Sequence, residues 1–273
     1  MKARVISGIC IGVILTLVLV LGGWVLLGAL FVVSVIAFFE LMGAVGVRKK
    51  GVSLSLPELA AVIGILELYL TLKLTGSLSC YIVSIMLVVI ALFFIYVFSF
   101  PRIHSRELIA TVFCFLYAPC MLSFIYLLWL LPYGNYAVWL PFLAWISDTC
   151  AYFAGRAFGR HKLTPKLSPK KTVEGAVGGV VGSVVAGMVF GFLFGRQAEN
   201  YHMIWIFAII TTVGSIIAQL GDLVASGIKR DHDIKDYGSC IPGHGGIMDR
   251  FDSVILVAPI LYFMTEFMWA MLT

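Results

Sequence analysis

The sequence has few charged residues for its length. It contains 19 Lys and Arg and 14 Asp and Glu in 273 residues, or 12% charged, where a soluble domain carries about 25%. Hydrophobic residues make up 61% and the mean hydropathy is +1.04. A water-soluble fold cannot cover that much apolar surface, and a disordered chain needs low hydrophobicity. Both classes are excluded, and an integral membrane protein is predicted.

The cysteines lack the spacing of a cross-linked or metal-binding framework. None of the six forms a Cys-x-x-Cys pair, and most lie within or at the ends of apolar runs. Cys240 has His232 and His244 near it in the sequence, but this mixed spacing does not match known zinc patterns. We therefore expect neither a disulfide framework nor a thiolate zinc site.

Apolar runs of membrane-spanning length fill most of the chain and predict an all-α polytopic fold with about nine transmembrane helices. The predicted spans are 6–22, 24–46, 57–75, 79–99, 107–131, 135–155, 173–195, 202–225 and 251–271. The first two spans form one run that is too long for a single helix, so we place a hairpin at Gly22-Gly23. A cleaved signal peptide over 1–22 is the alternative, and direct continuation into a second span favours the hairpin.

Lysine and arginine are concentrated in alternate loops, which predicts the orientation of the chain. With the N-terminus in the cytoplasm, 17 of the 19 basic residues lie on the cytoplasmic side. Only Lys73 and Arg196 lie on the other side. Nine spans preserve this partition, and they place the C-terminus outside.

The acidic residues are also unevenly distributed, because nine of the fourteen lie in residues 148–252. We therefore interpret 1–134 as a scaffold of transmembrane helices and 135–273 as the catalytic region. The catalytic region has two polar cytoplasmic loops, 156–172 and 226–250.

Asp148 lies inside a predicted span. Tyr152 and Gly155 follow it at i+4 and i+7, so they share its helix face. An ionisable residue at that depth is costly and normally faces a polar cavity. A functional role is favoured over an Asp that only bonds a neighbouring helix.

The first loop ends in Ser168-Pro169-Lys170-Lys171-Thr172, directly before a predicted helix start. Free N–H groups and the helix dipole favour an anion there, and the two lysines add positive charge. A positive-inside topology signal explains the charge equally well. The helix that follows has glycines at every fourth position from Gly187 to Gly195, which predicts close helix packing within one chain or between two.

The second loop is more informative. Asp222, Ser226 and Lys229 fall at i, i+4 and i+7 on one helix face, and Asp249 and Asp252 open the last span. A Gly-rich turn between them lets backbone N–H groups approach a ligand. Carboxylates with Lys and Arg beside them suit Mg²⁺ and phosphate. Structural ion pairs are the alternative, but they need neither a Gly-rich turn nor an Asp set back in an apolar helix.

The segment 226–252 resembles the signature of the phosphatidate cytidylyltransferases, also called CDP-diacylglycerol synthases. The matching residues are Ser226, Lys229, Arg230, Lys235, Asp236, Pro242, His244, Gly245, Gly246, Asp249, Arg250 and Asp252. No departure from the pattern occurs, and a dozen fixed positions make it specific. Segments 147–152 and 168–175 also resemble the family, whereas 1–140 is similar in hydropathy alone.

The resemblance implies transfer of the cytidylyl group of CTP to phosphatidic acid in a bacterial-type inner membrane, with the site facing the cytoplasm. It implies Mg²⁺, as one or two divalent ions, held by Asp222 and Asp249 with Asp252 and Asp148 in or near the shell. The catalytic set also includes Lys229, Arg230, Lys235 and Asp236. Substrate phosphates are assigned to Ser168, Lys170, Lys171, Ser226, His244, Gly245, Gly246 and Arg250.

The expected partners are CTP, phosphatidic acid and the bilayer, with no nucleic acid, and a homodimer through the Gly-rich helix. A polyprenol kinase is one rival, which would release CDP in place of pyrophosphate. A transporter is the other, since Glu40 and Glu67 lie within apolar segments. Transport sites lie near the midplane at a repeat interface, and no repeat is visible. The sequence does not decide whether these two glutamates are buried and neutral or bonded across helices.

Overall fold

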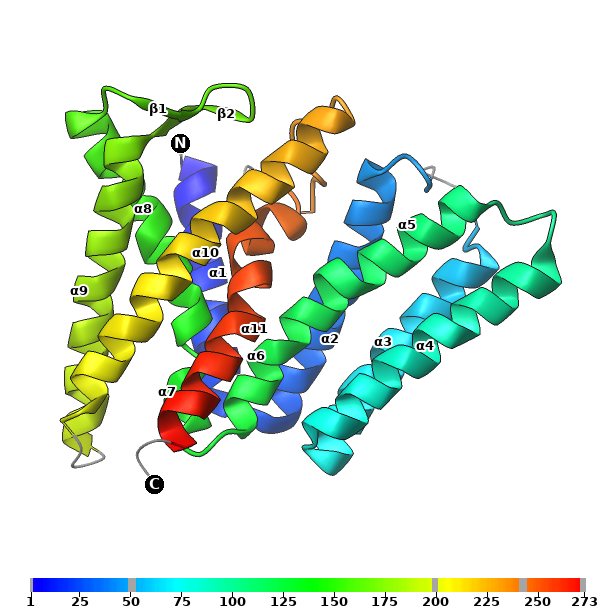
Figure 1. Ribbon diagram of the computed structural model, residues 1–273, viewed down its shortest axis with the longest axis horizontal. Helices are drawn as coiled ribbons and strands as arrows, with labels where there is room; N and C mark the ends of the chain where they lie inside the picture. Colours follow the sequence, from blue (N-terminus) through cyan, green and yellow to red (C-terminus); the bar gives the residue numbers. More distant parts are fainter. Residues whose placement is uncertain (1, 49–52, 198–200, 241–244, 271–273) are drawn as a thin grey trace. The chain divides into compact units, whose positions relative to one another are not determined.

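The computed structural model describes residues 2–48, 53–197, 201–240 and 245–270 (Figure 1). The described chain forms two compact units. The first unit consists of Met1–Leu130 with Asp231–Arg250, and the second of Leu131–Arg230 with Phe251–Thr273. In the residues described, the secondary structure of both units is helical apart from one short hairpin.

The first unit contains the N-terminal helices. They are α1 (Lys2–Leu21), α2 (Gly23–Ala44), α3 (Leu56–Thr75), α4 (Leu78–Ser99), α5 (Ser105–Phe115), the π-turn η1 (Leu116–Cys120) and α6 (Met121–Leu130). The second unit holds most of the remaining elements. They are α7 (Gly134–Ala137), the 3₁₀ turn η2 (Leu140–Phe142), α8 (Leu143–Phe158), β1 (Lys162–Thr164), β2 (Ser168–Thr172), α9 (Val173–Gln197), α10 (Met203–Asp231) and α11 (Met248–Ala270).

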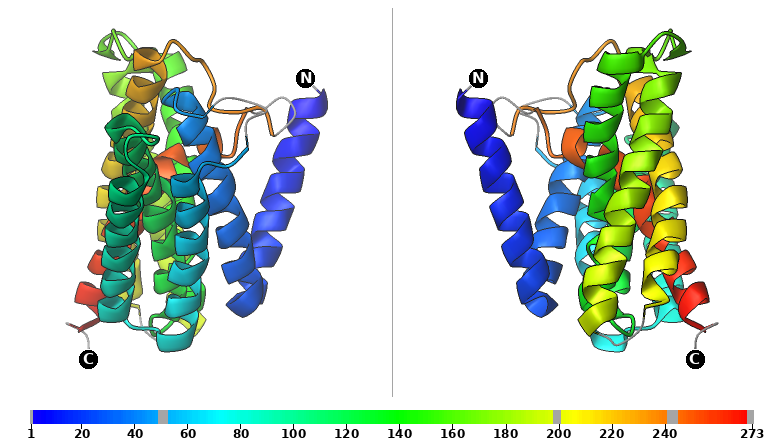
Figure 2. Two further views of the ribbon diagram at one scale, coloured as in Figure 1. Left: turned by 90° about the vertical axis from the view of Figure 1, so that its right-hand side faces the viewer. Right: turned by 90° about the vertical axis from the view of Figure 1, so that its left-hand side faces the viewer.

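The predicted hairpin at Gly22-Gly23 is confirmed. Both residues have positive φ, +57° and +49°, a conformation that glycine adopts without strain. A Cβ on Gly22 would lie 2.5 Å from Nε1 of Trp129, so the joint also has no room for a side chain. Figure 2 shows α1 and α2 meeting at this joint and diverging toward their other ends.

Helix α3 begins and ends at residues that the sequence marks clearly. Ser55 and Glu58 form a capping box, in which the Ser55 hydroxyl accepts the Glu58 N–H and the Glu58 carboxylate accepts the Ser55 N–H. Arg48 pairs with the same carboxylate at 3.3 Å. Gly76, with φ +61°, ends the helix and turns the chain into α4.

Helices α5 and α6 are continuous through η1, which contains Pro119. Proline donates no N–H and disrupts regular helical bonding. The Tyr81 hydroxyl and the Ser123 hydroxyl both donate to the Cys120 carbonyl, each at 2.7 Å. The wider turn is therefore satisfied by side chains of the same unit.

In the second unit, the glycines of α9 bring neighbouring helices into close contact, as Figure 1 shows for α8 and α9. A Cβ on Gly178 would collide with Ala154 of α8, and one on Gly191 would lie 2.6 Å from the Met203 carbonyl of α10. The packing predicted for this helix is therefore confirmed, and these contacts are made within one chain.

The helices confirm a polytopic all-α membrane protein. Within the described residues, seven helical segments are long and apolar enough to span a membrane. They are Gly23–Ala44, Leu78–Ser99, Ser105–Leu130, Gly134–Phe158, Val173–Arg196, Met203–Asp231 and Met248–Trp269. Helix α1, with a shorter apolar part at Gly8–Leu21, and helix α3 occupy the other two predicted positions. The number nine and the orientation of the termini stay predictions.

Candidate active site

The first polar loop contains a β-hairpin that the sequence analysis did not predict. Strands β1 and β2 are antiparallel, with Lys162 opposite Thr172 and Thr164 opposite Ser168. The hairpin lies at the ends of α8 and α9, within the second unit (Figure 1). Lys170 and Lys171 are therefore carried on a strand, which alternates their side chains between two faces.

Glu174 in the first turn of α9 fixes the start of this hairpin. Its carboxylate accepts the backbone N–H groups of Arg160 at 3.0 Å and His161 at 3.2 Å, and it contacts Nδ1 of His161 at 2.6 Å. The Thr172 hydroxyl accepts the Gly175 N–H at 3.1 Å. Because Lys162 lies opposite Thr172, all of these contacts are at the same end of the hairpin. Strand β2, which carries Lys171, is thus held to α9 at its C-terminal end.

Lys171 reaches Asp222 of α10. Its Nζ lies 2.5 Å from a carboxylate oxygen of Asp222, and each of the two side chains is 26% exposed. Ser226, one turn further along α10, donates its hydroxyl to the other oxygen of Asp222 at 3.4 Å. The helix face predicted from the spacing of Asp222 and Ser226 is therefore formed.

Asp252 of α11 joins this group. Its carboxylate is in electrostatic range of Asp222, Lys229 and Asp148. The approach is possible because Gly221 of α10 has no side chain. A Cβ there would lie 2.8 Å from the Asp252 carbonyl oxygen. We call Asp148, Lys171, Asp222, Lys229 and Asp252 the carboxylate cluster.

Three further predicted residues of the second unit lie outside the cluster. Ser168 and Lys170 are on β2, and Arg230 is in the last turn of α10. The side chains of Lys170 and Arg230 are exposed. Within the described residues, none of the three is joined to the cluster by a hydrogen bond or an ion pair.

The second loop was predicted at 226–250, but residues 226–230 are part of α10 in the second unit. Residues 231–250 belong to the first unit, and we call them the signature loop. Asp249, 9% exposed, accepts the backbone N–H groups of Tyr237 at 2.8 Å and Gly246 at 3.0 Å on one carboxylate oxygen. Gly245 has φ +81°, which explains the glycine at this turn. Asp249 therefore shapes the loop in addition to any role toward a ligand.

Glu40 of α2 also contacts the signature loop, and the sequence analysis assigned it no role. Its two carboxylate oxygens accept the backbone N–H groups of Ile247 at 3.1 Å and Met248 at 2.8 Å. An acidic residue one turn before the end of an apolar helix was the only signal in the sequence. Its partner, more than 200 positions away, was not visible there.

The other predicted residues of the signature loop lie at its surface or near its end. Lys235 and Asp236 are exposed, and Arg250 is half-buried in the first turn of α11. His244 lies outside the described residues.

The carboxylate cluster has the donor chemistry that Mg²⁺ requires. Mg²⁺ is usually bound through one or two carboxylates, with water and substrate phosphates completing its shell. Asp222 and Asp252 provide hard oxygen donors close to two lysines that can hold phosphate. Within the part of the chain described here, no group of three or more His, Cys, Asp or Glu side chains is placed to hold a metal ion. An ion at Asp222 and Asp252 would therefore need ligands from outside the protein, such as phosphate oxygens and water.

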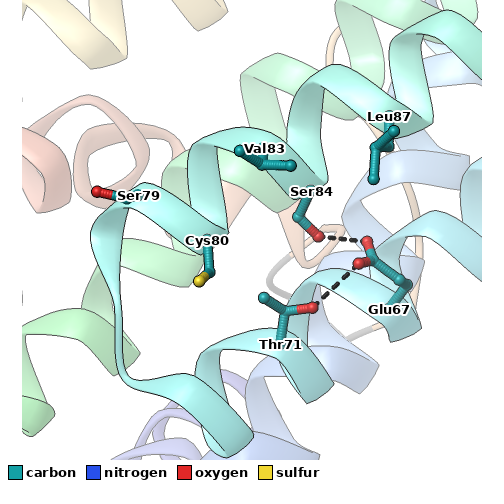
Figure 3. A pocket seen from close by; sticks show the side chains of 7 residues that line it. All are labelled: Glu67, Thr71, Ser79, Cys80, Val83, Ser84 and Leu87. Carbon is teal, nitrogen blue, oxygen red and sulfur yellow. Dashed lines mark hydrogen bonds between the residues drawn. The ribbon is translucent and has the colours of Figure 1, made fainter.

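Glu67 lines a cavity of about 320 Å³ between α3 and α4 (Figure 3). Its carboxylate accepts the hydroxyl of Thr71 at 3.0 Å and the hydroxyl of Ser84 from α4. Both glutamates are thus hydrogen-bonded across elements, which is one of the two arrangements that the sequence left open.

Comparison with known proteins shows which protein family the chain belongs to. The model of the cytidylyltransferase family matches residues 2–268, so the chain belongs to this family. A phosphatidate cytidylyltransferase from Staphylococcus saprophyticus is 34% identical over 266 residues, covering 96% of this chain and 97% of the relative. A phosphatidate cytidylyltransferase from Bacillus subtilis is 33% identical over 276 residues and 97% of both chains. The resemblance inferred from the signature is thereby confirmed.

Proposed function

We propose that this protein transfers the cytidylyl group of CTP to phosphatidic acid, giving CDP-diacylglycerol and pyrophosphate. One observation carries the proposal. The chain matches phosphatidate cytidylyltransferases over nearly its full length. The carboxylate cluster adds a chemical reason, because it gathers acidic and basic side chains at the ends of apolar helices. A lipid can keep its acyl chains in the bilayer there while its phosphate meets a water-soluble nucleotide.

In this reaction an oxygen of the lipid phosphate attacks the α-phosphorus of CTP, and the bond to the β-phosphate oxygen breaks. Both reactants are anionic, so catalysis requires positioning and charge neutralisation more than covalent help from the protein. Lys171 and Lys229 provide positive charge beside Asp222 and Asp252. No side chain is needed as a general base, since the lipid phosphate is already ionised.

Mg²⁺, when bound, would neutralise phosphate charge and orient the reacting oxygens. Asp222 and Asp252 would hold it, with Asp148 nearby. Asp249, the other ligand that the family signature implies, belongs to the first unit. Lys229, Arg230, Lys235 and Arg250 would bind phosphates, together with Lys170 and Lys171 of the hairpin. Ser226 would contribute its hydroxyl. We also propose that the backbone at Gly245-Gly246 contacts a phosphate. The Gly246 N–H donates to Asp249 in this structure, so it would have to change partner to bind phosphate.

The same proposal includes nine spans, a cytoplasmic N-terminus and an active site on the cytoplasmic side of the inner membrane. The charge partition of the loops supports this orientation. We also propose that the protein forms a homodimer, as expected from the sequence. The glycine contacts of α9 are made with α8 and α10 of the same chain, so they lend the dimer no support.

The test is pyrophosphate release by the purified protein in mixed micelles of detergent and phosphatidic acid, with Mg²⁺. We expect release that stops when either CTP or phosphatidic acid is omitted, with labelled cytidine recovered in the lipid. Recovery of free CDP and a newly phosphorylated lipid would instead identify a kinase. The matched control is Asp222→Asn, which should show neither product.

A further inference from the structure

Glu40 is a buried acidic side chain that the proposed chemistry does not use. It is 8% exposed and lies in α2, one turn before the helix ends at Ala44. Burying a carboxylate in an apolar helix is costly unless it is hydrogen-bonded. The structure compensates this cost with main-chain partners from the signature loop.

These partners lie at the beginning of a helix. Met248 is the first residue of α11, and Ile247 immediately precedes it. The first N–H groups of a helix have no partner within the helix, and the positive end of the helix dipole favours an anion. Glu40 supplies both the acceptors and the negative charge, at 3.1 Å and 2.8 Å. It therefore caps α11 from a helix that is distant in the sequence.

The loop is also shaped around this carboxylate. A Cβ on Gly238 or on Gly246 would collide with the Glu40 side chain. Two glycines of the signature loop therefore leave the space that Glu40 fills. The N–H of Gly246 in turn donates to Asp249 at 3.0 Å. Gly246 is thus held between Glu40 and Asp249.

We propose that Glu40 is the positioning residue of the signature loop: it fixes the backbone at 246–248 and, through it, the carboxylate of Asp249. The expected effect of Glu40 on the kinetics rests on the proposed cytidylyl transfer. The expected effect of Glu40 on the loop structure does not, because its hydrogen bonds exist whatever the substrate is. We therefore test the kinetic effect and the structural effect separately.

The kinetic measurement compares Glu40→Gln and Glu40→Ala with Glu67→Gln, in the detergent-purified protein. Glu67 is the matched control, since it is another glutamate of the first unit and its hydrogen bonds are to Thr71 and Ser84 of α3 and α4. Glu40→Gln keeps one acceptor oxygen and the side-chain shape. We expect its KM for CTP and its half-saturating Mg²⁺ concentration to rise about tenfold, the loss expected for one charge-assisted hydrogen bond.

Glu40→Ala loses both acceptors, and we expect kcat/KM to fall about 100-fold per folded molecule. Glu67→Gln should stay within about twofold of the wild type. A merely structural role would reduce the yield of folded protein and leave the KM for CTP of the surviving molecules unchanged. Unchanged constants in folded Glu40→Ala protein would overturn the proposal.

The second measurement needs no turnover and uses Cys240, an exposed thiol of the loop. Partial desolvation, and then the neighbouring Glu40 carboxylate, raise the pKa of Cys240. In Glu40→Gln the thiolate fraction should increase and the loop should loosen, so maleimide should label Cys240 several-fold faster at about pH 7.5. Mass spectrometry of the Cys240 peptide separates this thiol from the others.

The two measurements distinguish the possible failures. If the wild type releases no pyrophosphate but Glu40→Gln still accelerates Cys240 labelling and Glu67→Gln does not, the proposed function fails and the loop contact stands. If labelling is the same in all three proteins, Glu40 does not hold the loop and the positioning role is refuted.

Discussion

In the carboxylate cluster, Asp222 is paired with the ammonium group of Lys171, whereas in the signature loop Glu40 and Asp249 are paired with backbone N–H groups. A lysine side chain can rotate away and take a ligand phosphate without any change in the main chain. A backbone N–H can change partner only if the loop itself moves. Substitutions in the cluster should therefore change turnover and leave the fold intact, and substitutions in the loop should change both.

Asp249→Asn tests the loop side of this comparison and should have the largest effect. Asn removes the charge from the carboxylate that accepts the N–H groups of Tyr237 and Gly246. We expect turnover to be abolished and the folded state to lose about 1–3 kcal/mol, the cost of weakening hydrogen bonds at a buried site. Thermal unfolding in detergent, followed beside pyrophosphate release, measures both. If the variant is as stable as the wild type, the proposed role of Asp249 in stabilising the loop is wrong.

Asp222→Asn tests the cluster side. We expect kcat to fall about 1000-fold or more, about 4 kcal/mol of transition-state stabilisation, because a proposed Mg²⁺ ligand is lost. Its melting temperature should stay close to that of the wild type, since Asp222 and Lys171 are both partly exposed and such pairs contribute little to stability. Near-normal turnover in this purified variant would refute the metal assignment.

The two neighbouring lysines of β2 provide a smaller, internally controlled effect. Lys171 contacts Asp222, and Lys170 is exposed on the hairpin. We expect Lys171→Ala to lower kcat/KM about 10- to 100-fold. Lys170→Ala should raise the KM for a phosphate-bearing substrate by only a few-fold. Equal effects of the two substitutions would show that the contact of Lys171 with Asp222 has no role in turnover. If neither substitution has an effect, the two lysines serve only as a positive-inside signal for membrane orientation.

Much of the fold was predictable because lipid imposes a simple pattern on the sequence. The helix joint at Gly22-Gly23 and the glycine packing of α9 were both predicted from local residues. Several helices extend beyond the predicted spans. Helix α10 continues to Asp231 and α11 begins at Met248, whereas the predicted spans ended at 225 and began at 251. Apolar runs stop at the edge of the bilayer, but a helix continues through polar residues such as Lys229 and Arg230.

The site was only partly predictable, for a different reason. The pairing of Asp222 with Ser226 follows from helical spacing within one element. The contacts of Lys171 with Asp222 and of Glu40 with Met248 join elements far apart in the chain. Periodicity carries no information on such contacts. The β-hairpin could not be predicted from Pro165 and Pro169, because proline breaks helices but is also tolerated at strand ends and edges.

The π-turn at Leu116–Cys120 has a consequence for comparing this chain with its relatives. A π-turn takes one more residue than an α-turn, so everything after Cys120 faces as it would in a straight helix with one residue deleted. A relative that lacks one residue of this turn, and forms a regular α-helix there, would present α6 to the same surroundings. We expect single-residue gaps in alignments to fall at this turn, and counting across them without correction would rotate α6 by about 100°.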